Sequence, residues 1–259
     1  MLILLSPAKR LDFTPAPESL PLTQPVLREQ TAQLARTTRR LTAPDLKRLM
    51  HLSDDLTRLN RERFRAFDPE SEEGLQAALA FAGDVYQGLR ARELDRPALE
   101  WAQDRVRILS GLYGVLRPLD AIQPYRLEMG TALPTRRGKS LYAFWGDRIS
   151  HRLNADLEGH SDPTVVNLAS QEYFGAVDRK ALKAPVVEIR FLEEKDGEAR
   201  VLSFFAKQAR GLMARWAIER RVERAQDLKG FDAAGYRFAA DRSSDHEWTF
   251  TRPQPAPKA

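Results

Sequence analysis

The first five residues place the strongest constraint on the fold. Met1 to Leu5 form an unbroken apolar run that ends at Ser6-Pro7, and basic residues follow at positions 9 and 10. Five residues are far fewer than the ~20 that a helix needs to cross a bilayer. In a signal peptide the basic residues would precede the apolar run instead of following it. We therefore expect a buried strand, and neither a membrane span nor a secretory signal.

The remaining sequence predicts a helical block followed by a strand-rich half. Apolar residues recur at helical spacing from Arg28 to Arg65, and residues 71–104 continue this pattern with breaks at Gly83 and Pro97. Prolines at positions 15, 17, 21 and 25 make residues 12–26 an extended loop. In the second half we expect strands at Val106–Leu109, Thr164–Leu168, Pro185–Leu192 and Arg200–Phe205, a basic helix from Ala206 to Arg224, and a hairpin of Tyr236–Ala240 with Trp248–Thr251.

These elements predict an α+β fold. Strands from both ends of the chain are expected to share one mixed sheet, with the helical block beside it, in a single compact domain of residues 1–252. A chain of 259 residues with 42% hydrophobic residues is long and apolar enough for one core. Residues 253–259, with three further prolines, are expected to be a disordered tail.

The composition excludes several classes of site. The chain has no cysteine, which excludes disulfides, cysteine-ligated zinc or iron–sulfur centres, and thiol-based peroxide reduction. Its four histidines form no Glu-x-x-His or His-x-x-x-His pattern, and the common glycine-rich nucleotide motifs are missing. We therefore predict no metal and no cofactor. The absence of cysteine agrees with a cytoplasmic location.

Positive charge is concentrated in one helical segment. The net charge of the chain is +5, and Arg28 to Arg65 alone contain ten basic and five acidic residues. Within this segment, Pro44–Met50 and Asp54–Phe64 predict two short helices joined by His51-Leu52-Ser53, with Thr42 and Ser53 as helix caps. The pattern is similar to a helix-hairpin-helix element, in which backbone N–H groups and nearby cations hold a DNA phosphate without reading a base.

The sequence therefore gives a set of candidate DNA-binding residues in this hairpin: Lys47, Arg48, His51, Ser53, Arg58 and Arg61. The alternative is a solvated hairpin rich in arginine. His51 and Ser53 stand where the motif usually has glycines, and Asp54 and Asp55 would repel a phosphate. The basic helix from Ala206 is expected to lie beside this hairpin, with Trp216 in the core.

A second group of residues is typical of an enzyme for a small anionic substrate. Loops rich in glycine and arginine lie between Arg107 and Gly130, and polar residues follow the strands that end near Leu5 and Leu168. Its candidate residues are Lys9, Tyr113, Arg117, Arg126, Glu128, Ser170 and Lys207. Glu128 would act as a general acid or base, Lys9 as an amine nucleophile or charge clamp, and the arginines as anchors. Structural Arg–acid pairs under the loops would give the same composition.

Several longer motifs resemble the bacterial YaaA family, and they are collinear from Met1 to about Arg252. They are Ser6–Lys9, Gly83–Leu89, Leu109–Asp120, Pro124–Gly130, Phe144–Gly146, Asn167–Phe174 and Ala209–Arg215. The resemblance implies a role in resistance to hydrogen peroxide, through lowering unincorporated iron and limiting DNA damage. It also implies a single-domain α/β fold with a basic cleft and a helix-hairpin-helix element, which falls on Pro44 to Phe64. It assigns no catalytic role to the motif-rich loops.

The leading hypothesis is a cytoplasmic stress protein that binds double-stranded DNA without sequence preference and has no membrane partner. The enzyme with a small anionic ligand is the alternative, and an iron-binding regulator that uses only carboxylates is a third. The sequence predicts no oligomeric state.

Overall fold

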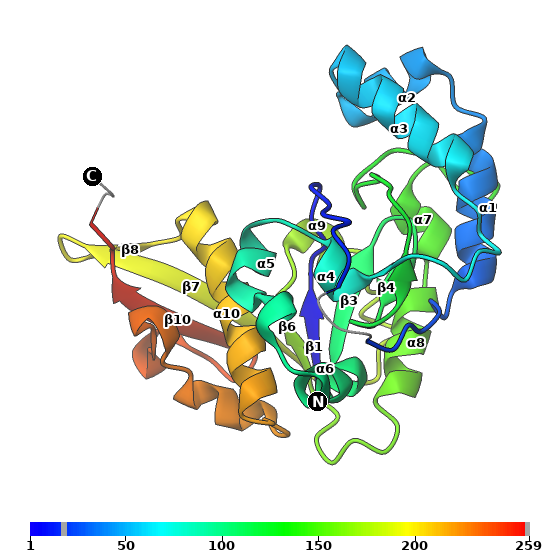
Figure 1. Cartoon of the computed structure of the whole chain (residues 1–259). Coiled ribbons are helices and arrows are strands. Elements are labelled where there is room, and N and C mark those ends of the chain that lie inside the picture. The colour runs from blue at the N-terminus through cyan, green and yellow to red at the C-terminus, as the bar shows by residue number, and fades with distance from the viewer. Residues whose placement is uncertain (17–19, 257–259) are drawn as a thin grey trace.

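A mixed β-sheet crosses the whole protein in the computed structural model, which describes residues 1–16 and 20–256 (Figure 1). The strand order is β4-β3-β1-β6-β7-β10-β9, and β8 pairs with the far end of β7. The parallel strands are β3 (Val106–Ser110), β1 (Leu2–Leu5), β6 (Val165–Asn167), β7 (Val186–Lys195) and β10 (Glu247–Pro253). The antiparallel additions are β4 (Gly114–Leu116), β8 (Glu198–Arg200) and β9 (Arg237–Phe238). The predicted α+β fold with a mixed sheet in one compact domain is confirmed.

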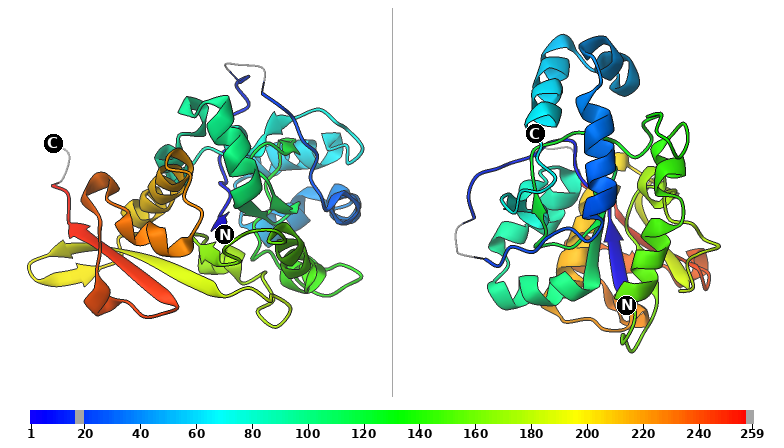
Figure 2. Two further views of the ribbon diagram at one scale, coloured as in Figure 1. Left: turned by 90° about the horizontal axis from the view of Figure 1, so that it is seen from below. Right: turned by 90° about the vertical axis from the view of Figure 1, so that its right-hand side faces the viewer.

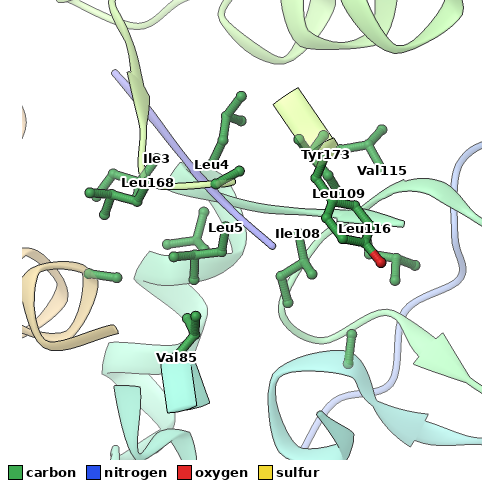
Figure 3. Packing of buried hydrophobic residues seen from close by; sticks show 14 of the residues in the cluster. Ile3, Leu4, Leu5, Val85, Ile108, Leu109, Val115, Leu116, Leu168 and Tyr173 are labelled. Carbon is green, nitrogen blue, oxygen red and sulfur yellow. The ribbon is translucent and has the colours of Figure 1, made fainter. Parts of the chain in front are cut away.

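Strand β1 lies between β3 and β6 and is completely buried. Ile3 is paired with Val106 on one side and with Val166 on the other. The side chains of Leu4, Leu5 and their neighbours on β3 pack into the core on both faces of the sheet (Figure 3). A strand covered on both faces is apolar at every position instead of alternating, which explains the unbroken run at residues 1–5.

Helices cover both faces of the sheet (Figure 2). On one face α10 (Ser203–Glu219) packs on α5 (Asp84–Leu89), on α6 (Arg96–Arg105) and on strands β1 and β7. The opposite face carries α7 (Leu141–Trp145) and α8 (Arg148–Asp156). Short elements fill the edges, namely α4 (Ala77–Ala80), α9 (Gln171–Phe174) and the two-stranded sheet of β2 (Leu75–Gln76) and β5 (Ala121–Ile122).

Helices α5 and α10 approach so closely that their backbones touch. A Cβ atom on Gly211 would lie 1.8 Å from the carbonyl oxygen of Val85, and one on Gly88 would lie 2.1 Å from that of Gln208. Only glycine fits at both positions. The contact fixes α5, from the first third of the chain, against α10, which begins more than 110 residues later.

Three helices form an arm that projects away from the sheet (Figure 1). They are α1 (Arg28–Arg39), α2 (Ala43–Met50) and α3 (Asp54–Ala66). The predicted caps are confirmed: Thr42 and Asp45 form a capping box at the start of α2, and the Ser53 hydroxyl accepts a hydrogen bond from Leu56 N–H at the start of α3. The α2–α3 pair with its link is called the hairpin below.

Two predictions about the second half were wrong. Residues 200–205 are not a strand, because β8 ends at Arg200 and α10 begins at Ser203. A tight turn at Asp196-Gly197, both with positive φ, closes the β7–β8 hairpin early. The helical spacing of buried Ala206, Ala209 and Met213 then overrides the strand propensity of the aromatic residues before it. Helix α10 also ends at Glu219 instead of Arg224.

Other segments agree with the sequence-based prediction in part, although Leu75–Gln76, in the region expected to be helical, form strand β2. The final hairpin is confirmed as β9 with β10. Pro97 lies in the first turn of α6, so it begins a helix instead of interrupting one. Strand β10 includes Pro253, and Gln254 N–H donates to the Glu194 carbonyl. Residues 257–259 of the predicted tail, and Pro17 of the predicted proline-rich loop, lie outside the described residues.

A buried ion triad connects the sheet to helix α8. Asp156 accepts hydrogen bonds from Arg107 of β3, at 2.7 Å, and from Arg152. The Arg107 and Asp156 side chains are only 5% and 3% exposed. Burial alone would raise the pKa of Asp156, but the two guanidinium groups outweigh it and hold that pKa below its ordinary value.

Removing this carboxylate should leave the buried Arg107 and the partly exposed Arg152 without a counter-charge. We expect Asp156→Asn to lower the free energy of unfolding by about 3–5 kcal/mol in urea titrations at pH 7. Asp55→Asn, which removes an exposed pair with Arg58, should cost less than about 1 kcal/mol. Because the pKa of Asp156 is lowered, its contribution is present above the unfolded-state carboxyl pKa and is lost as the pH falls through the folded-state value. Equal effects of the two variants would contradict this assignment.

The glycine contact between α5 and α10 gives a second prediction. Gly211→Ala should lower the free energy of unfolding by about 1–3 kcal/mol or more, because the methyl group meets backbone that has no room to move. The matched control is Gly230→Ala, where the nearest atom would lie at an ordinary 3.8 Å, and the change should stay within about 1 kcal/mol. Thermal and urea unfolding of both variants measure the difference.

Candidate functional site

The strand order reverses at β1, which places a crevice at one edge of the sheet. The chain passes from β1 to β3 on one side and later to β6 on the other side. In open parallel sheets, ligands bind outside the carboxyl ends of the strands at such a reversal. Ser6 follows β1 and Ser170 follows β6, and the two meet: Ser170 N–H donates to Ser6 Oγ at 2.8 Å, and the Ser6 hydroxyl donates to Ser170 Oγ at 3.3 Å.

A cleft of about 450 Å³ opens at this edge. Its walls come from the segment after β1, the start of α5, the segment after β6 and helix α10. The charged side chains that line it are Lys9, Arg10, Asp84, Glu172, Lys207 and Arg210. We call it the carboxyl-edge cleft. Of the residues predicted for a small-molecule site, it brings together Lys9, Ser170 and Lys207.

Two more predicted residues, Arg126 and Glu128, are connected to the cleft by a contact between Glu128 and Lys9. Its ammonium group is 3.4 Å from Glu128 Oε1, and Arg126 Nε donates to the same oxygen at 2.9 Å. The second oxygen, Glu128 Oε2, is buried and has no hydrogen-bond partner among the described residues. Lys9, Arg126 and Glu128 therefore form one charged cluster.

Helix α10 contributes the most buried cation of the cleft. Arg210 Nε is buried and lacks a hydrogen-bond partner within the described part of the chain. Burial lowers the pKa of Arg210, and only the more distant Glu188 opposes that shift. Lys207, one helical turn earlier, lies 3.9 Å from Asp84 Oδ2 and is half exposed. Arg210 and Asp84 were not among the residues predicted for this site, although the spacing of Lys207 and Arg210 on one helix face was a usable signal.

Two predicted members of the small-molecule site lie elsewhere. The Tyr113 ring is buried between Phe67 and Tyr125, its hydroxyl accepts Gln123 N–H at 3.0 Å, and burial raises its pKa. Arg117 forms an ion pair at 2.9 Å with Asp120, whose side chain is fully buried. In both cases a buried polar group needs an internal partner. This part of the loop-rich stretch is therefore structural.

The hairpin holds three of its six lysine and arginine side chains on its own carboxylates. Each of the three pairs lies within hydrogen-bond distance: Lys47 with Asp54 at 2.6 Å, Arg48 with Asp45 at 2.9 Å and Arg58 with Asp55 at 2.8 Å. These side chains are exposed, so the pairs are weak. Three of the six candidate DNA-binding residues are therefore already paired with a carboxylate.

The other predicted residues of the hairpin have mainly local roles. His51 ends α2 in a left-handed conformation with φ of 50°, and the Ser53 hydroxyl caps α3. Arg61 differs, because its buried Nε has no hydrogen-bond partner in the described residues.

The expectation that the second basic helix lies beside the hairpin is wrong: α10 packs on α5, far from the arm (Figure 1). Trp216 is buried, as expected.

Unpaired arginines gather instead in a groove beside the arm. The groove has a volume of about 470 Å³ and lies between the end of α1, the turn at residues 134–138 and Phe144. It is lined by Arg36, Arg40, Arg136 and Arg137, and in the described residues none of these side chains forms an ion pair. Arg137 lies 4.9 Å over the Phe144 ring and has a buried, unpartnered Nη1. We call this feature the arginine groove.

Arg36 and Arg40 are among the ten basic residues of the segment Arg28 to Arg65. Their meeting with Arg136 and Arg137 was not predicted from the sequence. One signal was present. Residues 129–146 contain Arg136, Arg137 and Lys139 but no acidic residue, so this turn has no local carboxylate to neutralise it. The meeting of two segments about 100 residues apart is a property of the fold.

Two absences complete the description. Within residues 1–16 and 20–256, no group of three or more histidine, aspartate or glutamate side chains is arranged to hold a metal ion. Over the same residues no helix combines the length and the apolar character that crossing a bilayer requires.

The fold and these sites define an α+β protein with a cleft at the carboxyl edge of its mixed sheet and a separate arginine groove. The sequence profile of the family described as "Peroxide stress protein YaaA" matches residues 1–242. A UPF0246 protein of Phenylobacterium zucineum is 70% identical over 259 residues, covering 100% of this chain and 97% of that protein. Those of Caulobacter vibrioides NA1000 (68%; 98% of this chain, 100% of that protein) and Maricaulis maris (57%; 99% and 97%) are also similar. The chain belongs to the YaaA family of peroxide stress proteins.

Proposed function

We propose that this protein protects DNA in the cytoplasm during peroxide stress by binding the duplex without sequence preference and limiting iron-driven damage. The observation that carries the proposal is the arginine groove, where four guanidinium groups line one surface and have no carboxylate partners within the described residues. Guanidinium groups match the geometry of phosphate oxygens and bind them with paired hydrogen bonds. Contacts to phosphates hold the duplex but carry no sequence information.

The groove is a stronger candidate than the hairpin for the first DNA contact. A phosphate that binds Lys47, Arg48 or Arg58 must replace a carboxylate that already holds the cation. In the groove no such exchange is needed. Arg40 follows the last residue of α1 and Thr42 caps α2, so the chain passes from the lining of the groove directly into the hairpin. The hairpin would then add weaker, salt-sensitive contacts, including one from Arg61.

Phosphate binding also suggests how iron damage is limited. Duplex DNA carries a condensed layer of counterions, and arginines that neutralise phosphates release them. Ferrous ions held on the duplex would be among those released, so fewer radicals would form next to the DNA. The absence of cysteine supports this shielding role over thiol-based destruction of peroxide.

Binding to a random-sequence duplex should depend on the groove arginines. We expect Arg36→Gln/Arg40→Gln to weaken binding in fluorescence anisotropy and to reduce the slope of log affinity against log salt by about 1.8, or 0.9 for each lost phosphate contact. The matched control, Arg48→Gln/Arg58→Gln, also removes two charges and should change the slope less. If the control variant loses more of the slope, the hairpin is the main site. Absence of wild-type binding at low salt would overturn the proposal.

Shielding can be measured directly on DNA. When supercoiled plasmid is exposed to ferrous iron and hydrogen peroxide, the wild-type protein should reduce the number of strand breaks. The reduction should be proportional to the fraction of the plasmid that the protein covers. The Arg36→Gln/Arg40→Gln variant should protect less at the same concentration, and salt that releases the protein should remove the protection. Protection that persists when the protein is dissociated would show that it acts on iron or peroxide in solution.

A further inference from the structure

We propose that the carboxyl-edge cleft is a second, independent binding site, and that it takes a phosphorylated small molecule. The DNA proposal does not use this cleft. The residues that line the cleft and those that line the arginine groove do not overlap, and the two features lie on different elements.

The charge of the cleft matches a phosphate group. Four basic and two acidic side chains line it, which leaves a net charge of +2. A phosphate monoester carries a charge of about −1.5 to −2 at neutral pH. Lys207 and Arg210 project from the same face of α10, and Lys9 reaches the cleft from the segment after β1. Three cations from two distant parts of the chain therefore converge on one space.

Arg210 points to a bound group rather than to a structural role. Two largely buried arginines outside the cleft have carboxylate partners: Arg107 is held by Asp156, and Arg215 by Glu93 and Glu219. Arg210 has a buried Nε with no partner in the described residues and no carboxylate in ion-pair contact. A buried donor without an acceptor is costly, and an anionic ligand in the cleft would satisfy it.

The size of the cleft indicates that the phosphate is attached to an organic group. Its volume of about 450 Å³ lies in the range of pockets that hold metabolite-sized ligands. Apolar surface from Val85, Tyr86 and Tyr173 lies beside the hydroxyl groups of Ser6 and Ser170. This combination suits a ligand with both hydrogen-bonding groups and a nonpolar part.

The walls of the cleft are rigid before any ligand binds. The Tyr86 hydroxyl donates to the Ser6 carbonyl at 3.1 Å, which connects α5 to the segment after β1. The Gly88–Gly211 backbone contact fixes α5 against α10. A site that is already formed loses little entropy on binding, so weak anionic contacts are enough for measurable affinity.

Inorganic phosphate is the minimal probe for this site. We expect saturable binding to the wild-type protein, with a Kd on the order of 1 mM by isothermal titration calorimetry, and competition by ribose 5-phosphate but not by ribose. Arg210→Gln should weaken phosphate binding about tenfold, because a charged hydrogen bond is lost. Lys207→Gln, at a half-exposed position that does not threaten folding, should weaken it in the same direction. Circular dichroism and thermal unfolding check that both variants are folded.

The control separates this proposal from DNA binding. Arg36→Gln/Arg40→Gln should bind phosphate as the wild type does, and a short DNA duplex should not displace phosphate from the cleft. The proposal is overturned if the wild type shows no saturable phosphate binding up to about 10 mM. It is also overturned if Arg210→Gln and Lys207→Gln bind normally while the groove variant does not, or if duplex DNA displaces the phosphate. The first two of these results do not depend on whether the protein binds DNA.

Discussion

The burial of strand β1 between β3 and β6 is the constraint on which the rest of the structure depends. Its hydrogen bonds to both neighbours place three carboxyl ends at one edge of the sheet. Ser6 and Ser170 can meet only because their strands are adjacent. Helices must then cover both faces, since every residue of β1 is apolar. The position of the cleft therefore follows from four buried residues near the beginning of the chain.

Local features of this fold were predictable from sequence, and non-local ones were not. The apolar run at residues 1–5 permitted only a buried strand, and Thr42 and Ser53 identified the starts of two helices because a cap is a local interaction. The strand predicted at residues 200–205 was wrong, because the tertiary packing of the following helix outweighs the strand propensity of the aromatic residues.

The candidate sites show the same division. Lys9 was placed correctly, because a cation directly after a buried strand must lie at the sheet edge. Tyr113 was placed wrongly, since nothing in the residues around it shows that Gln123 and two aromatic rings would enclose it. The arginine groove could not be predicted, because it joins the end of α1 to a turn about 100 residues later.

Net charge is a poor guide to where this protein presents a positive surface. The segment from Arg28 to Arg65 has the same +5 as the whole chain, yet its hairpin neutralises three of its cations with neighbouring carboxylates. The groove and the cleft contain fewer cations, but several of these have no carboxylate partner among the described residues. For binding an anion, the availability of a cation matters more than the total charge.

The backbone contact between Gly88 and Gly211 has a consequence for selectivity. Two of the cleft's sides are carried by helices that pack backbone against backbone, so these two sides resist sliding past one another when ligands of different widths bind. Side chains such as Lys207 can still change the outline of the cleft by adopting another rotamer. Such a site selects ligands by size and shape, and does not close around them by induced fit.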